Sequence, residues 1–367
     1  MTMLHIFKSK VNQLLFFSLV LSWANNMRGF MNRIGFACKY MHHDQSLPKK
    51  ELEAVERYYN TRTTTAKWLN SVDREIAEER LFSVISHNLQ SQLNILEYVY
   101  TLPRKLHMMR LSSDLLPMYT HHQFKYFYQR ADVKNLIETG FAAIGHYARS
   151  KDIRLSMHPG QFCVLASANQ NVVEKSIEEF EYHADMIRMM GYGISFQDFK
   201  CNIHISGHNG VAGVLAVLPR LSEVAINTIT FENEEKKFGL NACLELADYA
   251  PVVLDVHHCW INENDYISFN DDRVKKVIDS WHGVRPTMHY SQSREFIMDK
   301  GFLPSDKLVI SELLEVYNKK DLYAHSDYMW NDWTNLYVKE FMHFFDVMFE
   351  VKSKNMAVID YYKRYLI

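Results

Sequence analysis

A carboxylate and two imidazoles follow a short, strongly apolar stretch in the second half of the chain. Pro251 precedes three aliphatic residues, 252–254, and these lead to Asp255, His257 and His258. Consecutive aliphatic residues are typical of a parallel strand buried on both faces. Buried carboxylates and imidazoles need a partner, and a divalent metal is a common partner of Asp with His. The stretch alone leaves two interpretations open, a metal site and a histidine pair hydrogen-bonded at a strand end.

The same pattern recurs at five further points along the chain. Each short apolar segment ends in a histidine or an acidic residue, and amphipathic stretches separate most of them. The residues at the six segment ends are His158, His204, Glu232, Asp255, His289 and Glu350. One such segment end is weak evidence, but six in series indicate side chains that converge on one site.

Together with His258, these side chains are too many for one ion. Mixed histidine and carboxylate ligands suit a cluster of two or three divalent metals, with zinc or manganese favoured over magnesium. Glu232 comes from a middle segment, so its carboxylate could bridge two ions. Such clusters hold an attacking hydroxide and a leaving oxygen around a phosphate. They also occur in sugar isomerases, so the ligands leave both reaction classes open.

The elements that must position these residues alternate regularly between strands and helices. We predict eight strands, at 33–38, 106–111, 153–157, 202–206, 228–231, 252–255, 287–290 and 347–351. Long helices are predicted over 73–100, 132–149, 171–190 and 328–345, and shorter ones over 51–60, 211–221, 241–249 and 271–281. Asp132 is the expected N-cap of its helix. This alternation predicts an α/β fold, a closed (β/α)8 TIM barrel with a multinuclear metal site at the C-terminal ends of its strands.

Composition bounds the class of protein. The chain has 367 residues, 47% of them hydrophobic, which is enough for one large core, and we predict a single barrel domain over residues 32–367. The formal net charge of -2 gives no overall attraction to nucleic acid. Any site for a polyanion must therefore be a local basic patch.

The N-terminal segment is predicted to be an extension, residues 1–31. Its apolar run at 14–24 resembles the core of a signal peptide and is too short for a membrane span. The five cysteines show no CxxC spacing, which indicates reduced thiols and argues against export. Met27 or Met31 could be the working start. We expect a cytoplasmic or nucleoid-associated monomer (or a nuclear or host-cell protein, if the source is eukaryotic or viral) without membrane attachment or nucleotide cofactor.

Lysines and aromatic residues lie near several strand ends. The lysines are Lys236, Lys237, Lys352 and Lys354, and the aromatic residues are Phe36, Tyr40 and Phe162. Cations on this rim could contact phosphates, and DNA enzymes use aromatic rings to stack on displaced bases. Taken singly, a solvated lysine or a core aromatic is the commoner fate. Taken together, they favour a nucleic-acid substrate.

Five motifs resemble those of the UV damage endonuclease family. They are RIGF at 33–36, MHPGQF at 157–162, FENE at 231–234, LDVHH at 254–258 and DVMFEVK at 346–352. The resemblance covers the chain from Arg33 to its C-terminus. It implies a TIM barrel with a trinuclear site, usually manganese. It also implies nicking of double-stranded DNA immediately 5′ to cyclobutane pyrimidine dimers and 6-4 photoproducts, which leaves a 3′-hydroxyl and a 5′-phosphate.

The resemblance also implies roles for individual residues. One metal would be held by His158, His204 and Glu232, the second by Glu232, Asp255, His289 and Glu350, and the third by His258 and His325. The catalytic residues would be Glu232, His158 and His121, the last beside the scissile phosphate. Gln161 and Phe162 would enter the duplex at the lesion, with Phe36 and Tyr40 facing the opposite strand.

Some positions depart from the family pattern. Phe36 and Phe162 stand where tyrosine is usual, so stacking is retained and a hydroxyl is lost. Thr287 stands where many members have a lysine two residues before His289, which leaves open whether a modified lysine contributes to the site. The segment 291–327 is longer than expected, and the adjacent His257 and His258 leave a one-residue ambiguity.

Several functions remain open at this point. Alternatives to the UV damage endonuclease are an endonuclease IV-like enzyme that cuts at abasic sites and a metal-dependent sugar isomerase or epimerase on the same barrel. A nucleic-acid-binding protein with a degraded site is a third, and the presence of all the motif ligands counts against it.

Overall fold

The computed structural model describes residues 32–367, and these fold around a barrel of eight parallel strands. The strands are β1 (Ile34–Ala37), β2 (Met108–Arg110), β3 (Arg154–Met157), β4 (Lys200–His204), β5 (Ile229–Glu232), β6 (Val252–Val253), β7 (Thr287–Tyr290) and β8 (Asp346–Phe349). They pair in the order β6-β5-β4-β3-β2-β1-β8-β7. A backbone bridge between Asp255 and His289 joins β6 to β7. The predicted TIM barrel is confirmed.

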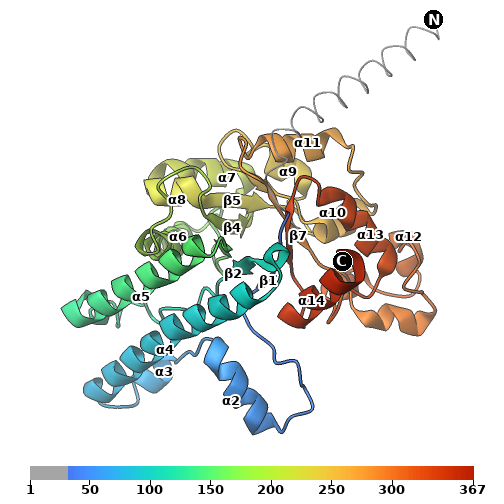
Figure 1. Cartoon of the computed structure of the whole chain (residues 1–367). Helices are drawn as coiled ribbons and strands as arrows, with labels where there is room; N and C mark the ends of the chain where they lie inside the picture. Colours follow the sequence, from blue (N-terminus) through green and yellow to red (C-terminus); the bar gives the residue numbers. More distant parts are fainter. Residues whose placement is uncertain (1–31) are drawn as a thin grey trace, which may run out of the picture. The chain divides into compact units, whose positions relative to one another are not determined.

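Helices cover the outside of this barrel (Figure 1). The longest are α4 (Arg74–Thr101), α5 (Ala131–Ser150) and α6 (Gln170–Met189), and α4 lies alongside α5. The others are α2 (Lys49–Tyr59), α3 (Ala66–Leu69), α7 (Gly210–Val217), α8 (Glu223–Thr228), α9 (Leu240–Leu244), α10 (Val256–Glu263), α11 (Asp272–Asp279), α12 (Ile310–Leu313), α13 (Asp332–Phe341) and α14 (Lys354–Tyr365). The main hydrophobic core lies between the helices and the strands.

The period of two along each strand determines which residues face the barrel interior. On β4, Cys201 and Ile203 join the hydrophobic core. Lys200, Asn202 and His204 share the opposite face, where Asn202 and His204 meet Glu232. The apolar face of each strand therefore supports the helices, and the inner face is free to carry polar chemistry.

The structure differs from the prediction at several helix boundaries. The helix predicted from residue 328 begins only at Asp332, because the Asn331 side chain caps it by accepting a hydrogen bond from Thr334 N at 2.8 Å. Asp132 is not an N-cap. Arg130 holds that position, and Asp132 lies in the first turn of α5, paired with Arg130 at 2.7 Å.

Helices α3, α8, α10 and α14 were not predicted. Helix α10 begins directly after β6, because the Asp255 side chain accepts a hydrogen bond from His258 N at 2.8 Å. The strand predicted to run to Asp255 therefore ends at Val253. The four unpredicted helices are 4, 6, 8 and 12 residues long, and the three shorter ones give little periodic signal.

The long segment 291–327 is packed and not a loose polar loop. Its apolar side chains form a second core with Trp260 and Ile261 of α10. The contributors from the segment are Ile297, Leu308, Ile310, Leu313 and Leu322. The segment therefore lies against the helix that carries His258.

Among the helices of residues 32–367, none combines the length and the hydrophobicity that a membrane-spanning segment needs. The predicted N-terminal extension, residues 1–31, lies outside the described residues, so its role and the domain boundary at residue 32 stay predictions.

The amino ends of the strands are held by a buried ion-pair network around Asp346. Its carboxylate is 2.7 Å from Arg154 Nη1 and 2.8 Å from Arg285 Nε, and it accepts a hydrogen bond from Arg33 N at 2.8 Å. Asp346 is 1% exposed. Because a buried charge without its partner is costly, this carboxylate neutralises guanidinium groups from two other strand ends.

We expect Asp346→Asn to lower the free energy of unfolding by about 3–5 kcal/mol, because it leaves buried guanidinium groups without a counter-charge. Urea unfolding of the chelator-treated protein measures this. Asp152→Asn is the matched control, since Asp152 pairs with Arg33 and Arg104 but is 49% exposed, and exposed pairs contribute about 0–1 kcal/mol. If the two variants lost equal amounts of unfolding free energy, the ion pairs of Asp346 would not stabilise the fold more than an exposed pair does.

Candidate metal centre

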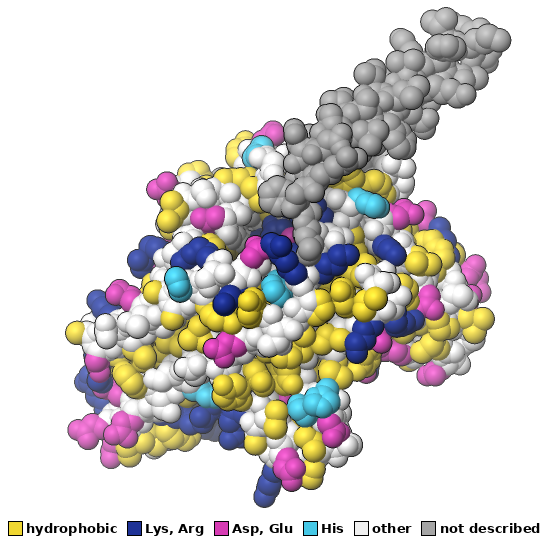
Figure 2. Space-filling model, viewed as in Figure 1, with side chains coloured by type: hydrophobic (Ala, Val, Ile, Leu, Met, Phe, Trp, Pro, Cys, Tyr) yellow, Lys and Arg dark blue, Asp and Glu magenta, His cyan; other side chains and the backbone are white. Residues whose placement is uncertain are grey.

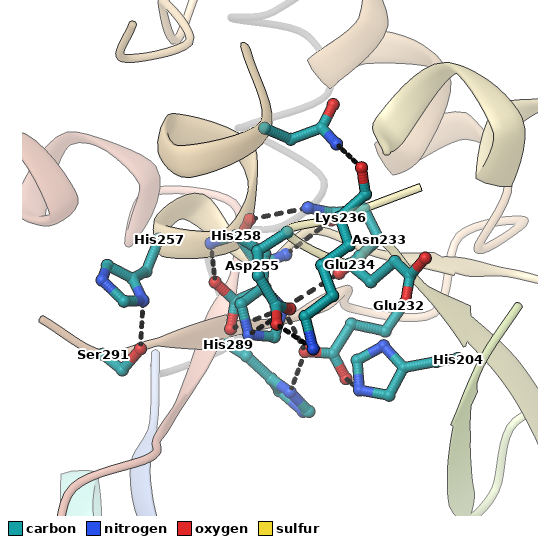
Figure 3. Close-up of polar contacts among 12 residues, drawn as sticks. His204, Glu232, Asn233, Glu234, Lys236, Asp255, His257, His258, His289 and Ser291 are labelled. Atoms are coloured by element: carbon teal, nitrogen blue, oxygen red, sulfur yellow. Dashed lines mark hydrogen bonds and ion pairs between the residues drawn. The ribbon is translucent and has the colours of Figure 1, made fainter. Parts of the chain in front are cut away.

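Glu232 lies at the centre of a cluster of histidines at the carboxyl ends of the strands (Figure 3). Its Oε2 is 3.4 Å from His158 Nε2 and 3.7 Å from His204 Nε2. Its Oε1 is 2.9 Å from His289 Nδ1 and 3.7 Å from His258 Nδ1. The Glu232 side chain is fully buried. The barrel thus brings together one carboxylate and four imidazoles from distant parts of the chain.

Three overlapping groups of side chains have the geometry to hold a metal ion. They are His158 with His204 and Glu232, Glu232 with Asp255 and His258, and Glu232 with His289 and Glu350. Within each group the ligand atoms lie within 4.8 Å of one another. The first group matches the ligand set predicted for the first metal. The set predicted for the second metal is divided between the other two groups, and Glu232 belongs to all three, as a bridging ligand would.

The two buried acids Glu232 and Asp255 differ in their charge state, and both have features that suit a cation. Burial would raise the pKa of Glu232, but the imidazoles of His289, His204 and His158 more than offset this and hold it well below its usual value. Burial raises the pKa of Asp255. Asp255 Oδ2 is buried and has no hydrogen-bond partner among the described residues. A mixed set of N and O donors around an unsatisfied buried oxygen fits divalent metal ions.

Asn233 holds the ends of β5 and β6 together. Its amide donates to Asp255 O at 2.9 Å, and its side-chain oxygen accepts from Asp255 N at 2.9 Å. Its backbone oxygen lies 3.0 Å from His258 Nδ1. The asparagine of the ENE motif therefore fixes two of the candidate ligands, Asp255 and His258.

His257 points away from the cluster (Figure 3). Its Nδ1 is 3.0 Å from Ser291 Oγ and its Nε2 is 3.1 Å from Ser293 Oγ. The ring stacks on Trp260. His257 is therefore a hydrogen-bonded core histidine, and of the adjacent pair it is His258 that the fold directs to the cluster.

Two cations that the sequence analysis did not single out lie beside the cluster. Lys200 Nζ is 2.7 Å from His289 Nε2, and burial lowers the pKa of Lys200 to about 7. Arg110 ends β2 and pairs with Glu350. A lysine therefore reaches the histidine of the seventh strand from β4, although Thr287 stands at the expected position. The signal for Lys200 was the alternation on β4, which places it on the same face as His204.

Two predicted residues lie outside the three groups. His325 forms an antiparallel backbone bridge with Ser293, and its ring centroid is 6.3 Å from that of His258. His121 follows β2 in a loop and stacks on His122 at 4.7 Å. Burial lowers the pKa of His121. Neither residue completes a ligand set in this conformation.

The predicted DNA-binding residues divide into a set that is accessible to solvent and a set that is buried in the core. Gln161 and Phe162 are exposed on the loop after β3, with Phe162 84% exposed. Lys236, Lys237 and Lys352 are also exposed, and Lys354 is half-buried. On the face shown in Figure 2, basic and acidic side chains are interspersed, in keeping with the small net charge.

Phe36 and Tyr40 do not match their predicted role. Phe36 is 1% and Tyr40 7% exposed, and both belong to the main core. Phe36 lies within β1, and the ring of Tyr40 packs against Tyr59 and Tyr98. The structure therefore does not present these two rings to a DNA strand.

We expect Mn2+ affinity to rise with pH, because His258 must lose a proton to become a ligand. Burial would lower the pKa of His258, but the carboxylates of Asp255, Glu232 and Glu235 raise it to about 9. Below that pH the metal-free site holds the proton, and each displaced proton gives about a tenfold gain in affinity per pH unit. Mn2+ titrations between pH 6.5 and 8.5 measure this slope, and a flat profile would contradict it.

Together, the barrel and the Glu232 cluster define a TIM-barrel protein with a candidate multinuclear metal centre. Comparison with known protein families identifies the family to which this barrel belongs. The family model described as UV-endonuclease UvdE matches residues 32–366. The chain belongs to this family, so the resemblance noted in the sequence is confirmed.

Individual relatives agree with this assignment. The UV DNA damage endonuclease of Clostridium perfringens is 26% identical over 297 residues, which cover 78% of this chain and 64% of that relative. This chain therefore spans slightly less than two thirds of that relative's length. The UV DNA damage endonuclease of Bacillus velezensis is 28% identical over 242 residues, covering 64% of this chain and 72% of the relative. The crystal structure of SacUVDE shares the fold, with a TM-score of 0.68 at 24% identity over 91% of this chain and 97% of that one.

Proposed function

We propose that this protein is a metal-dependent DNA repair endonuclease that nicks double-stranded DNA immediately 5′ to UV photoproducts. Its substrates would be cyclobutane pyrimidine dimers and 6-4 photoproducts, and its products a 3′-hydroxyl and a 5′-phosphate. The observation that carries the proposal is Glu232, shared by three ligand groups in a chain of the UV-endonuclease family. The names of the relatives support the substrate class.

The proposed cofactors are two or three Mn2+ ions, with Zn2+ or Mg2+ as alternatives. The residues that would hold them are His158, His204, Glu232, Asp255, His258, His289 and Glu350, with His325 as a further candidate. When bound, such ions supply a nucleophile at neutral pH and stabilise the charge that develops on the phosphate. Catalytic roles are proposed for Glu232, His158 and His121.

Neighbouring side chains would keep the acids ionised and oriented. Asn202 donates to Glu232 Oε2, and Thr230 Oγ1 donates to Asn202 Oδ1 at 2.8 Å, so the carboxylate has a fixed orientation. Burial would raise the pKa of Glu350, but the charges of Arg110 and His289 hold it well below its usual value. Supporting contacts of this kind set the geometry and affinity of metal ligands.

The exposed loop after β3 would recognise the lesion. A damaged dinucleotide is weakly stacked, so displacing it costs less than displacing sound bases. Phe162 offers an exposed ring to fill the gap, and the adjacent Gln161 offers an amide. Lys236, Lys237 and Lys352 would contact phosphates along the rim.

The test is nicking of an end-labelled duplex that carries one thymine dimer, beside an undamaged duplex, with Mn2+ or with EDTA. We expect a Mn2+-dependent cut immediately 5′ to the dimer. Glu232→Gln should lower the rate by on the order of a thousandfold, because it removes the shared ligand. Glu178→Gln is the control, since Glu178 lies half-exposed on α6, where it pairs with Lys125 and belongs to none of the ligand groups. A cut only at an abasic site would indicate an endonuclease IV-like enzyme, and no cut by metal-loaded protein would favour the isomerase class.

We expect Phe162→Ala to weaken binding to the dimer duplex by roughly 5- to 150-fold, because base stacking on an aromatic ring contributes about 1–3 kcal/mol. Fluorescence anisotropy with Ca2+ in place of Mn2+ measures binding without cleavage. The control is Ile194→Ala. Ile194 is 80% exposed but precedes β4, so it lies at the opposite end of the barrel. Equal affinity in the two variants would remove Phe162 from the binding surface.

A further inference from the structure

The loop between β2 and α5 carries His121, and a buried tyrosine of α6 holds the start of this loop. Tyr182 is only 6% exposed. Its hydroxyl donates a hydrogen bond to Ser113 O at 2.9 Å and accepts one from Leu116 N at 3.1 Å. One hydroxyl group therefore satisfies two backbone groups of residues 111–126, which we call the β2 loop.

A buried asparagine of α4 holds the same loop. Asn88 is fully buried, and its amide donates hydrogen bonds to Asp114 O at 3.2 Å and to Leu115 O at 3.0 Å. Together with Tyr182, it satisfies the carbonyls of three consecutive loop residues. Because a buried backbone group without a partner is costly, these contacts fix the start of the β2 loop between two helices.

The fixed part of the β2 loop also contacts the candidate metal centre. Ser113 Oγ donates a hydrogen bond to His158 O at 2.7 Å, and His158 belongs to the first ligand group. His158 Nδ1 lies 2.8 Å from Pro159 O, a carbonyl that can only accept, so Nδ1 carries the proton of the neutral ring and Nε2 faces Glu232. The β2 loop is therefore placed directly against a candidate metal ligand.

The next turn of the β2 loop presents His121. Met118 has a φ of +68°, which residues other than glycine seldom adopt, and its carbonyl accepts a hydrogen bond from His121 N at 3.1 Å. Such a conformation persists where the surrounding contacts impose it. Gln123 N donates to His121 Nδ1 at 3.3 Å. The neutral imidazole of His121 therefore carries its proton on Nε2 and can donate it in a hydrogen bond to a phosphate oxygen.

We propose that Tyr182 is a positioning residue for DNA cleavage, which sets the place of His121 relative to the metal centre through the β2 loop. The proposal rests on the proposed function, because it requires His121 to act at the scissile phosphate. Both hydrogen bonds of the Tyr182 hydroxyl go to the loop backbone, so Tyr182 acts through the loop. A displacement of about 1 Å in a reacting group can cost a reaction about 100-fold.

The first test separates the rate of cleavage from the affinity for DNA. Tyr182→Phe removes the hydroxyl and keeps the ring. We expect its single-turnover nicking rate on saturating dimer duplex to fall by about 10- to 100-fold, while the Kd for that duplex changes by less than about twofold. An unchanged nicking rate would overturn the proposal.

Tyr361→Phe is the matched control. Tyr361 is fully buried, and its hydroxyl donates to Asn335 O at 3.1 Å. The control therefore loses a buried hydrogen bond of the same kind, but this bond joins α14 to α13. Its nicking rate should equal that of the wild type. An equal loss of rate in Tyr361→Phe and Tyr182→Phe would show a general loss of stability and overturn the proposal.

A double-mutant cycle shows whether Tyr182 acts through His121. In the His121→Ala background, Tyr182→Phe should lower the nicking rate no further, because the group that it positions is gone. If Tyr182→Phe lowers the rate as much in this background as in the wild type, the effect does not pass through His121 and the proposal is wrong.

Hydrogen exchange follows the β2 loop without DNA. In the full-length protein, amides of residues 111–122 should exchange faster in Tyr182→Phe than in the wild type or in Tyr361→Phe, as measured by mass spectrometry. Exchange at the wild-type rate would overturn the proposal. If the wild type does not nick the dimer duplex but exchange rises in Tyr182→Phe, the endonuclease assignment is wrong and Tyr182 still sets the place of His121.

A second variant replaces Tyr182→Phe if that protein does not fold. Tyr119 lies in the β2 loop, and its hydroxyl donates to Asp185 Oδ2 of α6 at 2.9 Å. Tyr119→Phe therefore releases the same loop from the same helix at a partly exposed position. Its nicking rate should also fall, and this loss should also disappear in the His121→Ala background. A wild-type nicking rate in Tyr119→Phe would then overturn the proposal.

Discussion

The structure depends on one buried carboxylate, that of Glu232. A fully buried acid is costly unless charge and hydrogen bonds compensate it, and here four imidazoles and the Asn202 amide surround it. Those partners come from β4 and β7, from the loop after β3 and from α10. The cluster can therefore form only if the barrel brings these strand ends to the same point. The geometry of the barrel and that of the candidate metal centre depend on each other.

The barrel separates stability from chemistry by the two faces of its strands. Outward residues such as Cys201, Ile203 and Phe231 belong to the hydrophobic core. The inner face carries Lys200 and Asn202 next to the cluster, and at the opposite end Asp346 neutralises Arg154 and Arg285. The inner face is thus polar, and buried charges on it lie beside opposite charges, as in the pairs Arg110–Glu350 and Arg154–Asp346.

Sequence patterns predicted the barrel well because an apolar segment that ends in a histidine or an acid, weak evidence once, recurs six times along the chain. They located Glu232, His158, His204 and His289 for that reason. They failed where contacts join distant segments or where local signals are short. Nothing local separates His257 from His258 until the partners Ser291 and Asn233 are known. Phe36 and Tyr40 were predicted to be aromatic residues on the DNA-binding rim, although both are buried in the core. Lys200 was visible only once its face of β4 was known.

The contact between β6 and β7 has a consequence for the lifetime of the protein in a cell. Within the described residues, the ring is completed there by the bridge from Asp255 to His289, and both residues belong to the candidate centre. Ligands that bind only the native state suppress its opening, and local openings start where few bonds hold. Ions at the centre would link the two ends of the sheet. When metal is scarce, the contact between β6 and β7 would open more often and be exposed to proteases. The lifetime of the protein would therefore depend on the metal supply.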